Sequence, residues 1–168
     1  MAKSANLGFP RLGKNREWKR ACERYWRNVI SADELDVIAR ELMQTHWRLQ
    51  MEAEIDVIPV NDFSYYDHVL DMISLLGAVP LRYNADPAKP VDVDTYFAMA
   101  RGKQDETTDV TAMEMTKWFD TNYHYIVPEF DKNTSFRLAS DKPFQAVEYA
   151  QNIGIQIPDP LLLVRYLF

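Results

Sequence analysis

The fold is set by residues 18–60, WKRACERYWRNVISADELDVIARELMQTHWRLQMEAEIDVIPV, in which two helical patterns precede a short apolar run. Apolar side chains recur in the first part at intervals of three and four residues, the period of an amphipathic helix. They are Trp18, Ala21, Cys22, Tyr25, Trp26 and Val29. Asn15 is the expected cap of this helix, and Ser31 and Glu34 have the spacing of a capping box that opens a second one. A helical hairpin should therefore precede a buried strand over residues 55–60.

Helical and strand patterns continue to alternate along the rest of the chain. Further helices are predicted over residues 65–76, 92–102 and 142–152, and a further strand over residues 135–138. Residues 103–112 are polar and are predicted to be mobile. Helices that alternate with short apolar strands indicate an α/β fold with parallel strands. Because an eight-stranded β/α barrel needs about 250 residues, this chain is too short to close one.

Composition and charge narrow the class of protein. The chain has 168 residues, 47% hydrophobic and 26% charged, which is typical of a soluble globular protein. No apolar run approaches the ~18–20 residues of a membrane span. The net charge of −6 conceals a basic start, since residues 1–30 carry +6 and the other 138 residues carry −12. A local basic surface on an acidic protein favours a small polyanionic ligand over nucleic acid, and a solvated helix face is the alternative.

Signals for catalysis or metal binding are sparse in the sequence. Cys22 is the single cysteine, which excludes an internal disulfide and favours the reducing cytoplasm. Its place on the apolar stripe predicts burial rather than nucleophilic chemistry. His46, His68 and His124 are far apart, and none lies at metal-ligand spacing to another histidine or to Cys22. No metal or cofactor is therefore expected in this chain.

Three longer motifs are distinctive. Residues 7–13 read LGFPRLG and lead into REWK at residues 16–19, residues 58–70 read IPVNDFSYYDHVL, and residues 114–125 read EMTKWFDTNYHY. In this order and with this spacing they resemble the N-terminal part of cobalamin-independent methionine synthase. That family is the methyltetrahydropteroyltriglutamate–homocysteine S-methyltransferases. The resemblance runs from about residue 7 to residue 156.

The resemblance implies a fold and a set of binding residues. In the complete enzyme a C-terminal β/α barrel holds zinc and activates homocysteine, and an N-terminal barrel without metal helps to hold the folate. This chain would contain a partial N-terminal β/α (TIM-type) barrel preceded by the helical hairpin, with no catalytic residue of its own. The residues implied in contact with the folate polyglutamate are Arg16, Glu17, Trp18, Lys19 and Lys117. Arg and Lys supply charge-assisted hydrogen bonds to carboxylates, whereas Trp18 is expected to pack and Glu17 to orient the helix start.

The end of the chain departs from the family pattern. Residues 1–156 are expected to form the methionine-synthase-like domain, and residues 157–168 read IPDPLLLVRYLF where the family strand resembles TRPVxLGPVSF. A nucleotide sequence can be written that encodes this tail in one reading frame. In the frame that starts two nucleotides later, the same sequence encodes the family strand. A frameshift near codon 157 is therefore one hypothesis, and a natural C-terminus with a divergent strand is the alternative.

These observations lead to one main hypothesis and two alternatives. The main hypothesis is an N-terminal fragment of a cytoplasmic methyltransferase of methionine biosynthesis, which binds methyltetrahydrofolate polyglutamate but is inactive without the zinc barrel. A separate C-terminal barrel chain is the protein partner that this hypothesis allows, and no nucleic-acid or membrane partner is expected. The alternatives are a standalone folate-polyglutamate binding module and a structural remnant that self-associates through exposed strand edges.

Overall fold

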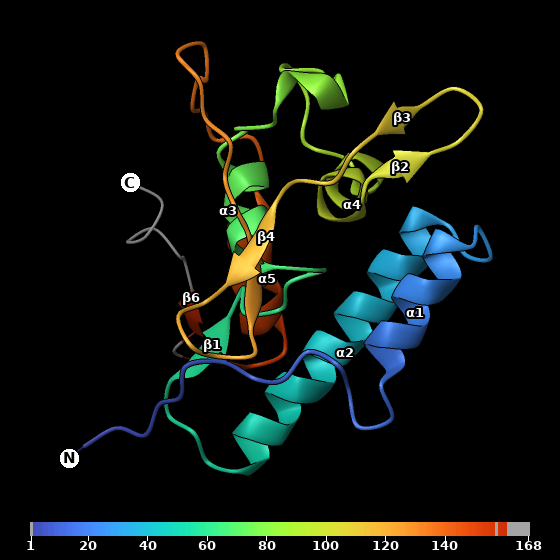
Figure 1. Cartoon of the computed structure of the whole chain (residues 1–168). Helices are drawn as coiled ribbons and strands as arrows, with labels where there is room; N and C mark the ends of the chain where they lie inside the picture. The colour runs from blue at the N-terminus through green and yellow to red at the C-terminus, as the bar shows by residue number, and fades with distance from the viewer. Residues whose placement is uncertain (1, 157, 161–168) are drawn as a thin grey trace. The chain divides into compact units, whose positions relative to one another are not determined.

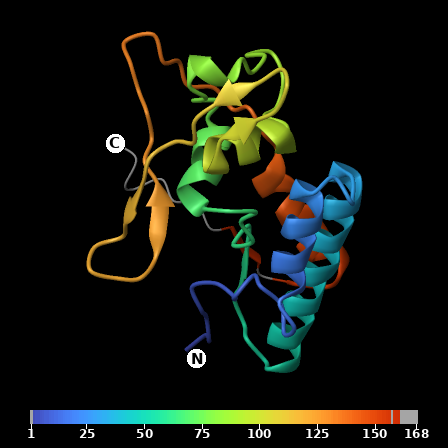
Figure 2. The ribbon, with the colours of Figure 1, turned by 45° about the vertical axis from the view of Figure 1, so that its right-hand side comes forward.

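In the computed structural model, α1 (Glu17–Trp26) and α2 (Ala32–Glu52) form the predicted helical hairpin. The two helices lie side by side in both ribbon views (Figures 1 and 2). Trp18, Ala21 and Cys22 are buried, as the period of the apolar stripe predicts. Val29 lies beyond the end of α1 and is 60% exposed, so the buried stripe ends before it.

The two helices of the hairpin begin in different ways. At α2 the Ser31 hydroxyl accepts the Glu34 N–H at 3.2 Å, and the Glu34 carboxylate accepts the Ser31 N–H at 2.7 Å. This capping box satisfies amides that have no partner within the helix. Arg16, not Asn15, precedes α1 and supplies no side-chain cap. The prediction for Asn15 is wrong because its side-chain amide donates instead to the Glu17 carboxylate, at 3.1 Å.

The described residues, 2–156 and 158–160, form two compact units. The first unit consists of residues 2–63 together with the described part of 143–160, and the second consists of residues 64–142. The described part of the first unit contains parallel strands: β1 (Ile58–Val60) pairs in parallel with β6 (Pro158–Pro160). A parallel bridge also joins Ala5 to Val57. Helices separate these parallel segments along the chain, as in β/α units.

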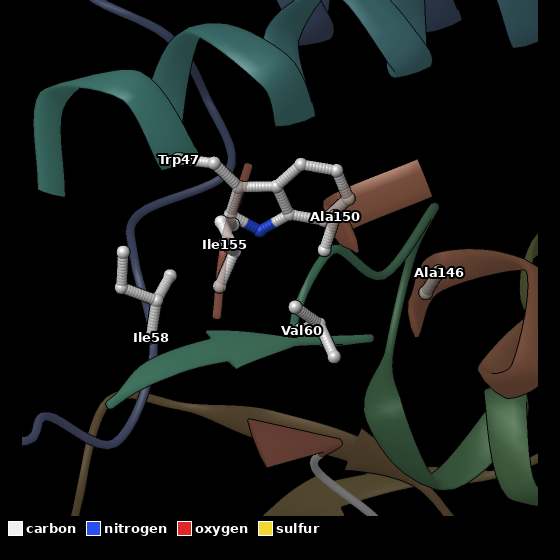
Figure 3. Close-up of a cluster of buried hydrophobic side chains, with 6 residues drawn as sticks. All are labelled: Trp47, Ile58, Val60, Ala146, Ala150 and Ile155. Atoms are coloured by element: carbon white, nitrogen blue, oxygen red, sulfur yellow. The ribbon is translucent and has the colours of Figure 1, made fainter. Parts of the chain in front are cut away.

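The core of the first unit lies between α2, β1 and α5 (Lys142–Asn152), a helix with the predicted bounds. Six buried side chains form a cluster there (Figure 3): Trp47, Ile58, Val60, Ala146, Ala150 and Ile155. The Trp47 indole N–H donates to the Pro59 carbonyl at 3.2 Å, so the polar atom of this large ring is paired inside the core. Burial of a large apolar side chain contributes about 1.5–3 kcal/mol to the free energy of unfolding.

Two capped helices organise the second unit. Asp67 precedes α3 (His68–Leu75) and accepts the Leu70 N–H at 3.0 Å. Asp92 precedes α4 (Val93–Arg101) and accepts the Thr95 N–H at 2.7 Å. A glycine with a positive φ follows each helix, Gly77 at 63° after α3 and Gly102 at 74° after α4. A short 3-10 helix, η1 (Leu81–Tyr83), lies between them in sequence.

Two antiparallel hairpins complete the second unit. The first joins β2 (Lys103–Gln104) to β3 (Asp109–Val110), so residues 103–112 have a regular structure that the sequence does not predict. Hydrogen bonds from the backbone and side chain of Thr107 lower the pKa of Asp105, in the loop of this hairpin, to about 2. The second hairpin joins β4 (Met115–Lys117) to β5 (His124–Ile126).

The predicted strand over residues 135–138 is absent from the structure. Two backbone N–H groups in and just after this segment bond to the end of α3 instead of to a neighbouring strand. The Arg137 N–H donates to the Leu76 carbonyl at 3.0 Å and the Ala139 N–H to the Leu75 carbonyl at 2.7 Å. These bonds satisfy carbonyls that a helix end leaves unpaired. Among the described residues each sheet has two strands and none is closed, so the mixed α/β class is confirmed without a barrel.

Candidate functional site

The start of α1 is a tight turn that exposes basic side chains. The Arg16 N–H donates to the Gly13 carbonyl at 3.1 Å, and Arg16 has a φ of 63°, in the left-handed region. Gly13 itself has a φ of 76°, and a Cβ there would lie 2.3 Å from the Glu17 carboxylate. Glycine is therefore required for the carboxylate to approach this closely.

Glu17 braces this turn. Its carboxylate accepts the Asn15 backbone N–H at 2.9 Å, in addition to the Asn15 side-chain amide. Hydrogen bonds from its own backbone N–H and from that of Asn15 lower the pKa of Glu17. The Arg20 guanidinium donates to the Asn15 carbonyl, so the turn is held from two sides. The carboxylate is thus engaged in holding the turn.

Trp18 and Lys19 point their side chains in different directions. Trp18 is 2% exposed and packs edge-on against Phe63, with ring centroids 5.0 Å apart. Its indole ring therefore contributes packing to the first unit. Lys19 is exposed, and its ammonium lies 3.7 Å from the Glu23 carboxylate, an i,i+4 pair worth about 0.3–0.5 kcal/mol. So weak an ion pair leaves the Lys19 ammonium available to another anion.

Four exposed cations gather over seven residues at this helix start. We call them the basic turn: Lys14, Arg16, Lys19 and Arg20. Charge-assisted hydrogen bonds to carboxylates are shorter and stronger than those between neutral groups, and guanidinium groups bind carboxylates through two parallel bonds. The basic turn is therefore chemically suited to a ligand that carries several carboxylates.

Lys117 lies in the second unit, at the end of β4. It stands opposite His124 of β5, and its side chain is exposed. The hairpin continues beyond this pair with a Trp118 N–H bond to the Tyr123 carbonyl, at 2.8 Å. Phe119, at the tip, is 76% exposed and has a φ of 50°. Lys117 is thus presented on a short hairpin with an aromatic tip.

The five predicted ligand-binding residues are therefore divided between the two units. Arg16, Glu17, Trp18 and Lys19 are consecutive at the start of α1, in the first unit, and Lys117 belongs to the second. Three of the five, Arg16, Lys19 and Lys117, present exposed cations. Joint contact of these side chains with one ligand stays a prediction.

A buried carboxylate pair in the second unit was not singled out from the sequence. Asp67 is 2% exposed, and its carboxylate accepts the Leu70 and Ile126 N–H groups and the Tyr123 hydroxyl. Asp71 is 9% exposed and accepts the Tyr96 hydroxyl at 2.6 Å and the Lys142 ammonium at 2.9 Å. Burial, together with the Asp71 charge, raises the pKa of Tyr96. An Asp before an apolar helical run signals a helix cap, but no local pattern indicates partners more than 50 positions away.

The residues that the structure describes do not suit a metal ion. Within them, no group of three or more His, Cys, Asp or Glu side chains could hold one. Cys22, the thiol of the chain, is 4% exposed on α1, and His124 is exposed with its ring nitrogen 3.2 Å from the Asn122 carbonyl. Zinc sites need clustered sulfur and nitrogen ligands. Among the same residues, no helix is long and apolar enough to cross a membrane.

A family model described as "Cobalamin-independent synthase, N-terminal domain" matches residues 3–167. The chain belongs to this family. The resemblance seen in the sequence is therefore confirmed. The family match extends to residue 167 and so includes most of the tail, residues 157–168. Within this tail, residues 157 and 161–168 lie outside the residues that the structure describes. The reading-frame hypothesis stays a prediction.

Relatives carry the name 5-methyltetrahydropteroyltriglutamate–homocysteine methyltransferase. The protein of Flavobacterium johnsoniae is 52% identical over 95% of this chain and 21% of its own length. That of Nitrosomonas europaea is 57% identical over 89% of the chain and 19% of its length. That of Saccharomyces cerevisiae is 48% identical over 100% of the chain and 23% of its length. The synthase domain described here spans about a fifth of the length of these relatives.

Proposed function

We propose that this chain holds the polyglutamate tail of methyltetrahydropteroyltriglutamate, as part of an enzyme that transfers its methyl group to homocysteine. The substrate in this proposal is taken from the names of the relatives, which include methyltetrahydropteroyltriglutamate and homocysteine. The observation that carries the proposal is the basic turn, where Arg16 and Lys19 are exposed on a backbone braced by Glu17. Lys117 would supply a further cation to the same tail.

The chemistry of the ligand suits these side chains. A triglutamate tail is a flexible polyanion, and each carboxylate that finds an ammonium or guanidinium gains a charge-assisted hydrogen bond. The excess of positive charge in residues 1–30 adds a longer-range attraction. Salt screens such an attraction, because the Debye length falls from about 30 Å at 0.01 M to about 10 Å at 0.1 M ionic strength.

The methyl transfer itself is assigned to parts of the enzyme outside this chain. Zinc, the cofactor of the family, would bind and activate the homocysteine thiol there, because the described residues offer no suitable group of ligands. This chain would contribute affinity and orientation for the folate. We place the activity in the cytoplasm, the reducing compartment that suits a chain with a single cysteine.

A binding experiment on the whole chain tests the proposal. Titration of methyltetrahydrofolate with one or three glutamates, followed by tryptophan fluorescence, should give tighter binding of the triglutamate and a loss of affinity with added salt. Lys19→Ala and Lys117→Ala should each weaken triglutamate binding by roughly 1–3 kcal/mol, because each removes a hydrogen bond to a charged group. Their combined effect should be less than additive if both hold one flexible tail.

Matched variants separate these contacts from a general change of charge. Arg48→Ala removes one exposed positive charge from the first unit and Lys132→Ala removes one from the second. Both should bind triglutamate as the unaltered chain does. Equal affinity for the mono- and triglutamate, or a Lys117→Ala variant indistinguishable from Lys132→Ala, would contradict the proposed function.

A further inference from the structure

We propose that Asp67 and Tyr123 are positioning residues for Lys117: their partly buried hydrogen bond fixes the β4–β5 hairpin, so that the Lys117 ammonium is held where a polyglutamate carboxylate can meet it. The inference rests on the proposed function and adds residues that act through the hairpin instead of touching the ligand. It follows from contacts within the second unit alone.

Asp67 joins the start of α3 to the hairpin. One carboxylate oxygen accepts both the Leu70 N–H of α3, at 3.0 Å, and the Ile126 N–H of β5, at 3.1 Å. The other accepts the Tyr123 hydroxyl, which lies three positions before Ile126. Asp67 is 2% exposed, so its bonds to the two backbone N–H groups are buried, whereas Tyr123 is 41% exposed and its bond to Asp67 is partly buried. Because an unsatisfied buried acceptor is costly, these donors are held firmly in place.

Tyr123 and Ile126 lie on either side of the residue that faces Lys117. In the hairpin His124 pairs with Lys117 and Ile126 with Met115. The Trp118 N–H bond to the Tyr123 carbonyl, at 2.8 Å, joins the residue after Lys117 directly to Tyr123. Asp67 therefore fixes the partner strand both before and after the position opposite Lys117.

The hairpin needs such an anchor. Its two strands have three residues each, and an isolated two-stranded hairpin is marginally stable in water. All three residues of β4 are exposed, whereas Ile126 of β5 is fully buried. Ile126 thus anchors one end of the hairpin, and the Tyr123 hydroxyl anchors the part nearer the tip. Without that hydroxyl, the section that carries Lys117 should move more freely.

The chain offers a matched pair of variants. Substitution of Asp67 would also uncap α3, so a loss of folding would obscure the result. Tyr123→Phe removes one hydroxyl and leaves the cap and the ring in place. Tyr125→Phe makes the same chemical change two residues away on β5, in a half-buried ring that packs edge-on against Trp118 at 5.5 Å. Loss of the Tyr125 hydroxyl should leave the anchor intact.

Ligand binding gives the first readout. Tyr123→Phe should weaken triglutamate binding about threefold to tenfold and leave monoglutamate binding unchanged, since only the tail would meet Lys117. Tyr125→Phe should match the unaltered chain for both ligands. An equal loss for the two ligands would mean that Tyr123 acts on general stability, and it would overturn the inference.

Amide hydrogen exchange of residues 113–127 gives a second readout that needs no ligand. Tyr123→Phe should speed exchange in this peptide roughly fivefold relative to Tyr125→Phe, because one hydrogen bond that restrains it is lost. Equal exchange in the two variants would overturn the inference while leaving the proposed function standing. If the unaltered chain shows no preference for triglutamate, the proposed function fails, and the positioning role fails with it.

Discussion

Arg16 combines an exposed positive charge with a strained backbone. Its φ of 63° and ψ of 36° lie in the left-handed region, which costs a side-chain-bearing residue about 1–2 kcal/mol. Strained backbone is frequent where a residue serves a ligand and the surrounding structure holds it in place. At Arg16 the restraints are the Gly13 carbonyl and the turn that Glu17 braces. The strain is consistent with the binding role proposed for this residue.

Arg16→Gly should therefore separate stability from binding. Glycine removes the left-handed strain but adds about 0.5–1 kcal/mol of conformational entropy to the unfolded chain. The net expectation is an increase of up to about 1.5 kcal/mol in the free energy of unfolding, measured with urea. Triglutamate binding should weaken by about 1–2 kcal/mol, because the guanidinium is lost.

Glu54→Gly is the control for the strain in this comparison. Glu54 has a φ of 57° just after α2 and lies in the same unit. Its replacement should also raise the free energy of unfolding, with no loss of triglutamate affinity. If Arg16→Gly bound triglutamate as tightly as Glu54→Gly, Arg16 would not belong to the binding site.

Among the elements, α2 offers the most direct test of a sequence prediction. Ser31→Ala removes the hydroxyl that accepts the Glu34 N–H and should lower the free energy of unfolding by about 1 kcal/mol. Ser135→Ala, at an exposed serine outside any helix, should have little effect in the same urea titration. Equal midpoints for the two variants would mean that the capping box contributes nothing to stability.

The pH dependence of the same cap follows from Glu34. Hydrogen bonds from Ser31 lower the pKa of the Glu34 carboxyl in the folded chain. A carboxyl whose folded pKa is depressed stabilises the fold above its unfolded pKa and loses this contribution as the pH falls through the folded value. The contribution of Glu34 to the cap should accordingly be present at neutral pH and disappear in acid.

Local patterns predict the helices well and the hairpins poorly. The apolar period and the Ser31–Glu34 spacing are contained within each helix, so α1, α2 and α5 can be read from the sequence. The β4–β5 hairpin is held by Asp67, more than 50 positions earlier, and such a contact leaves no local signal. Residues 135–138 have an apolar strand pattern, yet their amides serve the end of α3. The charge of the basic turn and an orienting role for Glu17 are predicted from the sequence, but the hydrogen bonds by which Glu17 braces the turn are not.

At the scale of the whole molecule, the proposed binding residues are carried by different units. Arg16 and Lys19 depend on the hairpin of α1 and α2, whereas Lys117 depends on Asp67 and β5. Each contact can therefore be weakened separately by a substitution in its own unit.

Methyl transfer can be assayed with the chain alone and with a complex that supplies the rest of a relative. Since the chain spans about a fifth of the length of its relatives and its described residues suit no metal ion, we expect no methyl transfer from the triglutamate substrate to homocysteine when it is assayed alone. Mixed with a zinc-loaded fragment that supplies the rest of a relative, it should form a complex with measurable turnover. Lys117→Ala should reduce that turnover at low triglutamate concentration, and Lys132→Ala should not. A stable complex without turnover would favour a folate-binding module over a part of a catalytic enzyme. Turnover by the chain alone would contradict the assignment of the methyl transfer to the rest of the enzyme.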